Sequence, residues 1–320
     1  MTPKKEFKDS KTASRYVVVT PVRDEELYIE IMIKSVLEQL KKPDKWVIVD
    51  DGSTDQTSTI IATHTQGIDW ITVLKTKSTQ RNLGSAEITA FNKGIDIIKI
   101  DDFDFIIKLD GDVKLEPNYF QEILGRMVLD PKWGVTSGVY CEKHDDHWAP
   151  VKMPPYHAAG ASKVVKRECY EMIGGFVDKK GWDTLDEIRA ELNGWKVGHF
   201  EDIQFKHLKP EGIVMGRLST HFFHGEIYYQ TGGGLLFLFA KGVHRMVLAR
   251  PLIIGGLTMI AGYLMSLVKR KQRLVNKLEA RFYRNQLNKR FLKTIIGAFQ
   301  FNNPLKLKVL LNFFAMQIKS

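Results

Sequence analysis

"VIVDDGSTDQT", residues 47–57, joins an apolar, β-branched run directly to two carboxylates, a glycine and a string of small hydroxyl and acidic residues. A short run of this composition predicts a buried strand, and the Asp-Gly-Ser that follows predicts a turn. The stretch therefore places Asp50 and Asp51 at the tip of a strand. Open α/β sheets bind ligands outside the carboxyl ends of their strands, so this tip is expected to be a binding site.

The same pattern recurs on both sides of this stretch, where short β-branched runs alternate with segments of helical period. Such alternation is typical of βαβ units and predicts a Rossmann-like, mostly parallel sheet flanked by helices. The predicted strands cover residues 16–22, 45–51, 70–76, 104–112 and 133–140. The predicted helices cover residues 25–41, 54–64, 83–99 and 117–129. Further on, a helix over 184–195 and a strand over 196–208 are expected.

The charge of the chain is unevenly distributed. Its 320 residues carry a net charge of +10, and 44% of them are hydrophobic, which is enough for a sizeable core. From Ala240 to Ser320 there are 16 lysines and arginines but one acid, Glu279, whereas the rest of the chain has 31 basic and 36 acidic residues. Basicity confined to the tail favours an anionic membrane surface over nucleic acid as the partner.

The chain divides into three predicted parts: an N-terminal tail over 1–15, a catalytic domain over 16–230 and a basic helical region over 231–320, with the boundary at the Gly-rich "QTGGG". The tail lacks the apolar core of a signal peptide, and two separated cysteines, Cys141 and Cys169, fit a reducing compartment. The expected location is the cytoplasmic face of the cell membrane.

The C-terminal region contains 18 uncharged residues from Pro251 to Val268 with basic flanks on both sides. As a helix it would reach roughly 27 Å, short of a hydrocarbon core of about 30 Å, so a re-entrant or interfacial segment is preferred to a true span. Leu287, Phe291, Ile295 and Phe299 then follow at helical spacing opposite basic residues, which predicts a membrane-surface helix. A core helix packed on the first domain is the alternative.

"LDGDVKLEP", residues 109–117, places two carboxylates two residues apart around a glycine after a buried run. A tight turn there would let Asp110 and Asp112 converge on one hard divalent cation, Mn²⁺ or Mg²⁺, with positions left open for substrate phosphates. A solvated Asp-Gly turn is the alternative.

Six stretches occur in an order and spacing that resemble family 2 glycosyltransferases of the GT-A fold. The resemblance runs from about Tyr16 to about Gly225 and rests on "TPVRDEE" (20–26), "VIVDDGSTDQT" (47–57), "RNLGSAEITAFNKGI" (81–95), "IIKLDGDVKLEP" (106–117), "KRECYEMIGGF" (166–176) and "GWDTLDEIRAELNGW" (181–195). It implies a nucleoside-diphosphate-sugar donor, a divalent cation and sugar transfer with inversion.

Carried over motif by motif, the resemblance assigns nucleotide-binding roles at the strand tips. Asp51 would accept a hydrogen bond from the uracil imide, and Asp110 would face both the ribose and the metal that Asp112 binds directly. The remaining nucleotide-binding candidates are Thr20, Pro21, Arg23 and Arg81, the last together with Gly84.

The resemblance also assigns a general base. The family usually shows Glu-Asp where this chain has Trp182-Asp183, so the pair is broken but the aspartate remains. Asp183 is therefore the predicted base, with Asp186 and Glu187 as competitors. Asp183 could instead cap the helix expected from Thr184, and Trp182 could face a sugar ring or lie in the core.

Family members often supply a histidine as a third metal ligand, and His207 is the first choice here, before His221 and His224. Lys209 and Arg217 are candidates to clamp the leaving diphosphate.

The sequence thus predicts an inverting glycosyltransferase that moves a sugar from a nucleoside-diphosphate donor, expected to be a UDP-sugar, to a lipid-linked saccharide or polysaccharide acceptor. The alternatives are a nucleotidyltransferase and a catalytically reduced, membrane-docked scaffold.

Overall fold

The computed structural model describes residues 14–77, 85–209, 216–248 and 252–299. Arg81 and Gly84 lie outside these residues, as does the side chain of Arg217.

One mixed sheet of nine strands forms the centre of the described chain, in the order β3-β2-β1-β4-β8-β6-β9-β5, with β7 paired to β6. The parallel half contains β3 (Ile71–Lys75), β2 (Lys45–Asp50), β1 (Tyr16–Val22) and β4 (Phe105–Leu109). The antiparallel pairings involve β8 (Ser162–Lys166), β6 (Trp133–His144), β7 (His147–Pro150), β9 (Lys196–His207) and β5 (Val113–Leu115), although β6 and β9 run parallel to each other. The predicted mixed sheet with flanking helices is confirmed, but four of its eight pairings are antiparallel, so the expectation of a mostly parallel sheet is wrong.

Helices cover both faces of this sheet because its strands carry apolar side chains on both faces. One face packs against α1 (Ile29–Leu37), α2 (Thr57–Thr65) and α4 (Tyr119–Leu129). The other face packs against α3 (Ala86–Asp96), α5 (Arg167–Met172) and α6 (Trp182–Leu192), and a short 3-10 turn, η1 (Ile100–Asp102), precedes β4. A Cβ on Gly94 would lie 2.6 Å from the Val19 side chain, so glycine is what lets α3 approach the sheet closely.

Two predicted boundaries differ from the structure in ways that matter for function. The strand expected over 104–112 ends at Leu109, and a turn through Gly111 leads into β5, which pairs with the end of β9. The helix expected from Thr184 begins at Trp182, after Gly181 with a φ of 80°. Asp183 therefore lies inside the first turn of α6 and is not its N-cap.

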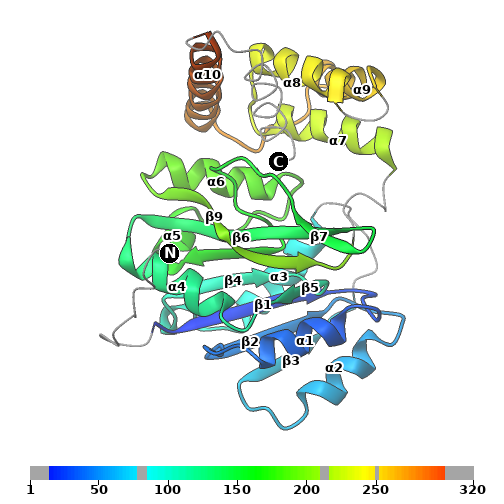
Figure 1. Cartoon of the computed structure of the whole chain (residues 1–320), viewed down its shortest axis with the longest axis vertical. Helices are drawn as coiled ribbons and strands as arrows, with labels where there is room; N and C mark the ends of the chain where they lie inside the picture. Colours follow the sequence, from blue (N-terminus) through cyan, green and yellow to red (C-terminus); the bar gives the residue numbers. More distant parts are fainter. Residues whose placement is uncertain (1–13, 78–84, 210–215, 249–251, 300–320) are drawn as a thin grey trace.

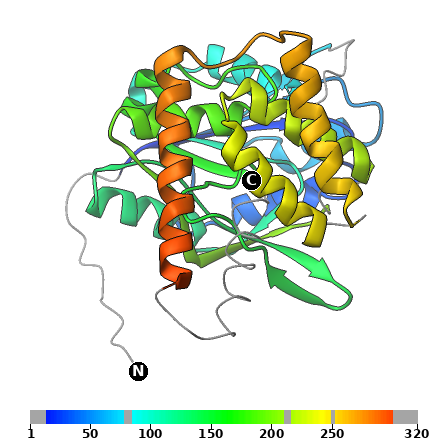
Figure 2. The ribbon, with the colours of Figure 1, turned by 90° about the horizontal axis from the view of Figure 1, so that it is seen from above.

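Four helices form a separate unit above α6 (Figures 1 and 2). They are α7 (Arg217–Gln230), α8 (Leu235–Leu248), α9 (Ile254–Val268) and α10 (Lys277–Phe299), and we call them the helical unit. Helix α7 precedes the Gly-rich break where the sequence places the domain boundary, yet it packs closely along α9. The backbones meet at Gly225 and Gly262, where an added Cβ would lie 1.9 Å and 2.2 Å from carbonyl oxygens of the facing helix.

Helix α10 joins the helical unit to the sheet domain. Arg189 Nε on α6 lies 2.9 Å from the Glu279 carboxylate, and Arg290 lies 2.6 Å from Glu191. Leu287 is buried in the core of the helical unit, so this part of the predicted membrane-facing stripe packs against protein. The side chains of Ile295 and Phe299 lie outside those described.

No helix in the described residues is both long and apolar enough to cross a membrane. The apolar segment from Pro251 to Val268 contains α9, which is 15 residues long.

Candidate active site

The tips of β1, β2 and β4 enclose a cavity of about 220 Å³, which we call the strand-tip cavity. It contains five of the predicted site residues: Pro21, Arg23, Asp51, Asp110 and Asp112. Ala86 and Ala90 of α3 line it as well, and their small side chains leave the space open.

The loops after β1 and β2 hold each other through hydrogen bonds. The backbone N–H of Thr54 donates to the Asp24 carboxylate at 2.8 Å, and the backbone N–H of Glu25 donates to the Thr57 hydroxyl at 2.8 Å. Asp24 has a φ of 55°, a conformation that aspartate tolerates better than most residues. The acidic "RDEE" thus serves partly to fix the rim of the strand-tip cavity.

Asp51 and Asp50 have different roles. Asp51 lines the cavity, and its carboxylate accepts hydrogen bonds from the Thr76 hydroxyl at 2.5 Å and from Lys93 Nζ at 3.1 Å. Asp50 instead accepts hydrogen bonds from the backbone N–H of Ser53 and from the hydroxyl of Ser58, so it organises the turn.

Thr20 does not line the cavity, contrary to the prediction. Its side chain is fully buried on the opposite side of β1, where its hydroxyl accepts a hydrogen bond of 2.9 Å from Trp46 Nε1. Residues alternate in direction along a strand, so Thr20 and the cavity-lining Pro21 face opposite sides of the sheet.

Asp110 is paired with a lysine that sequence reasoning missed. Lys108 is buried within β4, and its Nζ donates to Asp110 Oδ1 at 2.5 Å and to the carbonyl of Gly160 at 3.1 Å. Burial alone would lower the pKa of Lys108, but Asp110 and Glu87 outweigh it and hold the pKa above its usual value. Lys108 therefore remains a buried cation directed at the "LDGD" turn.

Asp112 and His207 form the best candidate for cation ligands. The antiparallel pairing of β5 with β9 sets Val113 opposite His207, which places His207 Nε2 3.5 Å from Asp112 Oδ1. One carboxylate and one imidazole fit Mn²⁺, which takes its other ligands from water and phosphate. Among the described residues no group of three or more His, Cys, Asp or Glu side chains is arranged to hold a metal. Asp110, the remaining candidate ligand, is hydrogen-bonded to Lys108.

A second cavity, of about 360 Å³, lies between the sheet domain and the helical unit, and we call it the interdomain cavity. Asp183 lines it together with Asp110, Trp182 and His207. Asp110 and Glu87 also line the strand-tip cavity, so the two cavities adjoin at these carboxylates. The predicted base and the predicted nucleotide and metal residues thus line two adjoining cavities.

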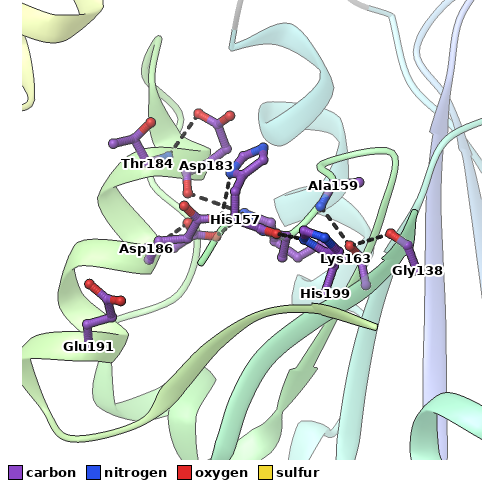
Figure 3. A network of polar contacts seen from close by, with 12 residues as sticks. Gly138, His157, Ala159, Lys163, Asp183, Thr184, Asp186, Glu191 and His199 are labelled. Atoms are coloured by element: carbon purple, nitrogen blue, oxygen red, sulfur yellow. Dashed lines mark hydrogen bonds and ion pairs between the residues drawn. The ribbon is translucent and has the colours of Figure 1, made fainter. Parts of the chain in front are cut away.

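The two competing candidate bases, Asp186 and Glu187, are side chains of α6 that are ion-paired within a buried polar network (Figure 3 shows Asp186). Lys163 Nζ lies 3.0 Å from Asp186, and His157 Nδ1 lies 2.9 Å from Glu187. Burial alone would lower the pKa of Lys163, but Asp186 and Glu187 outweigh it and raise the pKa above its usual value. Asp183 is more exposed, and the hydrogen bond to its carboxylate comes from the backbone N–H of Thr184 at 2.9 Å.

Trp182, which stands where the family has glutamate, is packed between two cations. Its ring has Lys108 Nζ 5.2 Å and Lys163 Nζ 4.8 Å from its centroid, and its Nε1 donates to Glu87 at 3.0 Å. The ring is buried, as the core alternative expects, and it also lines the interdomain cavity. Trp182 thus contacts three charged residues, Lys108, Lys163 and Glu87.

The other predicted residues fall at different places. Lys209 Nζ lies 2.8 Å from Glu25, which lines the strand-tip cavity. His221 lies in the helical unit with its Nδ1 2.6 Å from Arg245, whereas His224 lines the interdomain cavity. Sequence reasoning missed Glu87 and Lys108, which both fall inside the quoted motifs. For Lys108 the available signal was a charge within a buried strand.

Comparisons with known proteins agree with this architecture. The family "Glycosyl transferase family 2" matches residues 17–179, about half of the chain. No curated protein sequence matches.

Three solved structures share the fold. The mannosyltransferase PcManGT from Pyrobaculum calidifontis, solved with GDP-Man and Mn²⁺, aligns with a TM-score of 0.54 at 16% identity, over 98% of this chain and 89% of that one. TarS 1–349 of S. aureus with UDP-GlcNAc gives 0.50 at 16% identity, over 83% and 78%. GalNAc-T7 with UDP, GalNAc and Mn²⁺ gives 0.55 at 13% identity, over 82% and 56%.

The predicted family is confirmed by the match over residues 17–179, and the structural likenesses show the GT-A sheet with its flanking helices. With the strand tips, the Asp-Gly-Asp turn and the acid of α6 gathered around adjoining cavities, the chain is a nucleotide-sugar glycosyltransferase that belongs to glycosyl transferase family 2.

Proposed function

We propose that the protein transfers a sugar from a UDP-sugar to a lipid-linked saccharide or polysaccharide, with inversion at the anomeric carbon, using a divalent cation and Asp183 as the general base. One observation carries the proposal: the strand-tip and interdomain cavities adjoin at Asp110 and Glu87, with Asp51 and Asp112 on one side and Asp183 on the other. This arrangement fits an in-line displacement, in which the acceptor approaches from the side opposite the leaving diphosphate.

The proposed role of each residue follows from its position in the two cavities. Asp51 would accept a hydrogen bond from the uracil base once the Lys93 and Thr76 side chains, which donate to it here, have moved away. Pro21 and Arg23 would line the nucleotide-binding slot. Asp183 would take the proton from the acceptor hydroxyl, since Asp186 and Glu187 are held by Lys163 and His157.

Asp112 and His207 would hold the cation, with Asp110 beside them. When bound, the cation would neutralise charge on the diphosphate as a Lewis acid. Two of the structural relatives were solved with Mn²⁺, which supports this choice of metal. Lys209, paired with Glu25 at the rim, would approach the diphosphate if that pair opened.

A donor screen tests the proposed reaction. The full chain is incubated with a panel of UDP-sugars and GDP-sugars, with Mn²⁺ or with EDTA, and the released nucleotide is measured. We expect one UDP-sugar to release UDP at least about tenfold faster with Mn²⁺ than with EDTA. Release of pyrophosphate would indicate nucleotidyl transfer, and no release from any donor would favour the scaffold alternative.

We further propose that the helical unit docks on the cytoplasmic face of an anionic membrane. Large apolar side chains are exposed on α8 and on α9 with the residues just before it: Leu235, Leu236, Phe239, Val243, Leu252, Ile253, Ile254, Leu257, Leu264, Met265, Leu267 and Val268. These two helices lie on the side of the unit away from the sheet (Figure 1). A basic run from Lys269 to Arg273 follows α9 directly. Apolar surface next to basic residues is the composition of an interfacial anchor.

Two exposed side chains test the membrane proposal. We expect the partition coefficient of the double variant Phe239→Glu, Leu257→Glu onto vesicles with anionic lipid to be at least about tenfold lower than that of the wild type. Each substitution removes apolar contact and adds a negative charge that the anionic lipid repels. Cosedimentation measures this partition. Leu129→Glu, on an exposed leucine of α4, is the control and should sediment like the wild type. Equal binding by the double variant would refute docking through this face.

A further inference from the structure

Glu87 lies where the two cavities adjoin. It is in the first turn of α3, and it lines both the strand-tip cavity and the interdomain cavity, as Asp110 does. In the proposed reaction the diphosphate lies near Asp112 and the acceptor hydroxyl lies near Asp183. The transferred sugar connects the two, so it must lie beside Glu87 and Asp110.

The Glu87 carboxylate is held in place from the side of the core. Its Oε1 accepts a hydrogen bond of 3.0 Å from Trp182 Nε1, and its Oε2 lies 3.6 Å from Lys108 Nζ. Trp182 is 5% exposed and the Lys108 side chain is 1% exposed, whereas 45% of the Glu87 side chain is exposed. A carboxylate has about four acceptor positions, so two buried partners leave capacity for hydrogen bonds from a ligand. The Glu87 carboxylate is thus a preoriented acceptor at the edge of both cavities.

The two partners of Glu87 do not by themselves require a charged residue at this position. Lys108 Nζ is already paired with Asp110 Oδ1 at 2.5 Å and with the carbonyl of Gly160 at 3.1 Å. Trp182 Nε1 needs one acceptor, which the oxygen of a neutral amide would also supply. Glu87 therefore adds negative charge beyond what these partners need, which favours a role toward a ligand.

The tryptophan at position 182 is matched by this carboxylate. The family usually has glutamate there, whereas an indole N–H can only donate a hydrogen bond. Trp182 instead orients Glu87 through that N–H. Helix α3 thus brings to the first turn of α6 a carboxylate that α6 lacks at this position.

We infer that Glu87 determines specificity for the transferred sugar: its carboxylate accepts hydrogen bonds from hydroxyl groups of that sugar, which is neutral and not a uronic acid. This inference rests on the proposed function and deepens it, since it names the class of sugar. Sugar hydroxyls are donors, and hydrogen bonds to an ionised acceptor are stronger than those between neutral groups. A uronic acid would instead bring its own carboxylate next to Glu87 and Asp110, which would repel it.

Calorimetry tests the inference on the full chain with Mn²⁺ and without acceptor. The ligands are UDP, UDP-glucuronate and four neutral donors: UDP-glucose, UDP-galactose, UDP-N-acetylglucosamine and UDP-N-acetylgalactosamine. The wild type should bind the best neutral donor at least about tenfold more tightly than UDP-glucuronate. Glu87→Gln should bind that neutral donor at least about tenfold more weakly than the wild type does, with the Kd for UDP within about twofold, because a charge-assisted acceptor is lost only toward the sugar.

Two controls separate specificity from a structural role. UDP-glucuronate should bind Glu87→Gln no more weakly than the wild type, because a repelling charge is removed, whereas a loss of structure would weaken the binding of every ligand. Glu122→Gln is the matched variant, since Glu122 lies in the first turn of α4, has a side chain that is 41% exposed and lines neither cavity. Its Kd values should all equal those of the wild type.

Thermal melting checks that the variant folds. Glu87→Gln keeps an oxygen for Trp182 Nε1, so it should melt near the wild-type temperature. If it melts well below, Glu87→Asp serves as the second variant. It keeps the negative charge beside Lys108 but shortens the side chain, and it should show the same loss of affinity for the neutral donor.

The remaining outcomes each decide the inference. Unchanged binding of the neutral donor by Glu87→Gln, or tightest binding of UDP-glucuronate by the wild type, would overturn it, even if the donor screen releases UDP. Absence of binding by every sugar donor would overturn both the inference and the proposed function. If a neutral donor binds in a Glu87-dependent way but the donor screen releases no UDP, the proposed transfer reaction is wrong and the role of Glu87 stands.

Discussion

Asp183→Asn is expected to lower kcat by about 10² to 10⁴-fold while the Kd for UDP stays within twofold of the wild type. The substitution removes only the ability to take a proton, because the asparagine oxygen can still accept the hydrogen bond from the Thr184 backbone N–H. Asp183 lines the interdomain cavity and not the strand-tip cavity, so nucleotide binding should not depend on its charge. Steady-state rates at saturating donor and calorimetry with UDP measure the two quantities.

Two controls accompany this variant. Asp178→Asn changes an exposed acid in the loop before α6 that lines neither cavity, so it should retain near-normal turnover. Glu187→Gln examines the competing base. If Asp183→Asn turns over normally while Glu187→Gln does not, the base is Glu187, and the assignment made here is wrong.

Asp112→Ala should abolish the effect of Mn²⁺ on UDP binding. In the wild type the Kd for UDP should be at least about tenfold lower with Mn²⁺ than without it, and in the variant the two values should coincide. The physical reason is that Asp112 and His207 lie 3.5 Å apart, whereas Asp110 is held by Lys108 and cannot replace the lost carboxylate without breaking that pair. Calorimetry with and without Mn²⁺ measures the difference.

His207→Ala should also reduce the effect of Mn²⁺ on the Kd for UDP. This result would identify His207, and not His221 or His224, as the metal ligand. Asp146→Ala, at an exposed turn between β6 and β7, should leave the Mn²⁺ effect unchanged. A persistent tenfold effect of Mn²⁺ in Asp112→Ala would show that the cation is held elsewhere.

The local pattern predicted most of the sheet. The run ending at Asp50 gave a strand with nearly the expected bounds, as did the run from Tyr16 to Val22. Periodicity succeeds here because a buried strand needs apolar residues on both faces, and this requirement is visible in a window of a few residues. The strand over 104–112 was overextended because a turn through Gly111 and a three-residue strand leave little local signal.

The sequence predicted correctly those site residues that directly follow the ends of strands. Asp51, Asp110 and Asp112 meet at one cavity because parallel strands present their carboxyl ends on the same edge. Motif position placed Thr20 at the cavity, but its buried hydroxyl is instead hydrogen-bonded to Trp46, a contact between two strands that no short stretch of sequence specifies. The pairing of Lys108 with Asp110 depends on side-chain direction at the end of β4 and on Gly160 from a distant segment.

The sequence by itself therefore determined the family, most of the strands and helices up to β6, and the acids at the strand tips, because each is specified by short patterns along the chain. Only the tertiary structure decided that α10 ties the helical unit to α6, that Glu87 of α3 lies where the two cavities adjoin, and that α7 packs on α9. Such contacts join residues far apart in sequence, and they depend on how whole helices pack together, which no local window of sequence specifies.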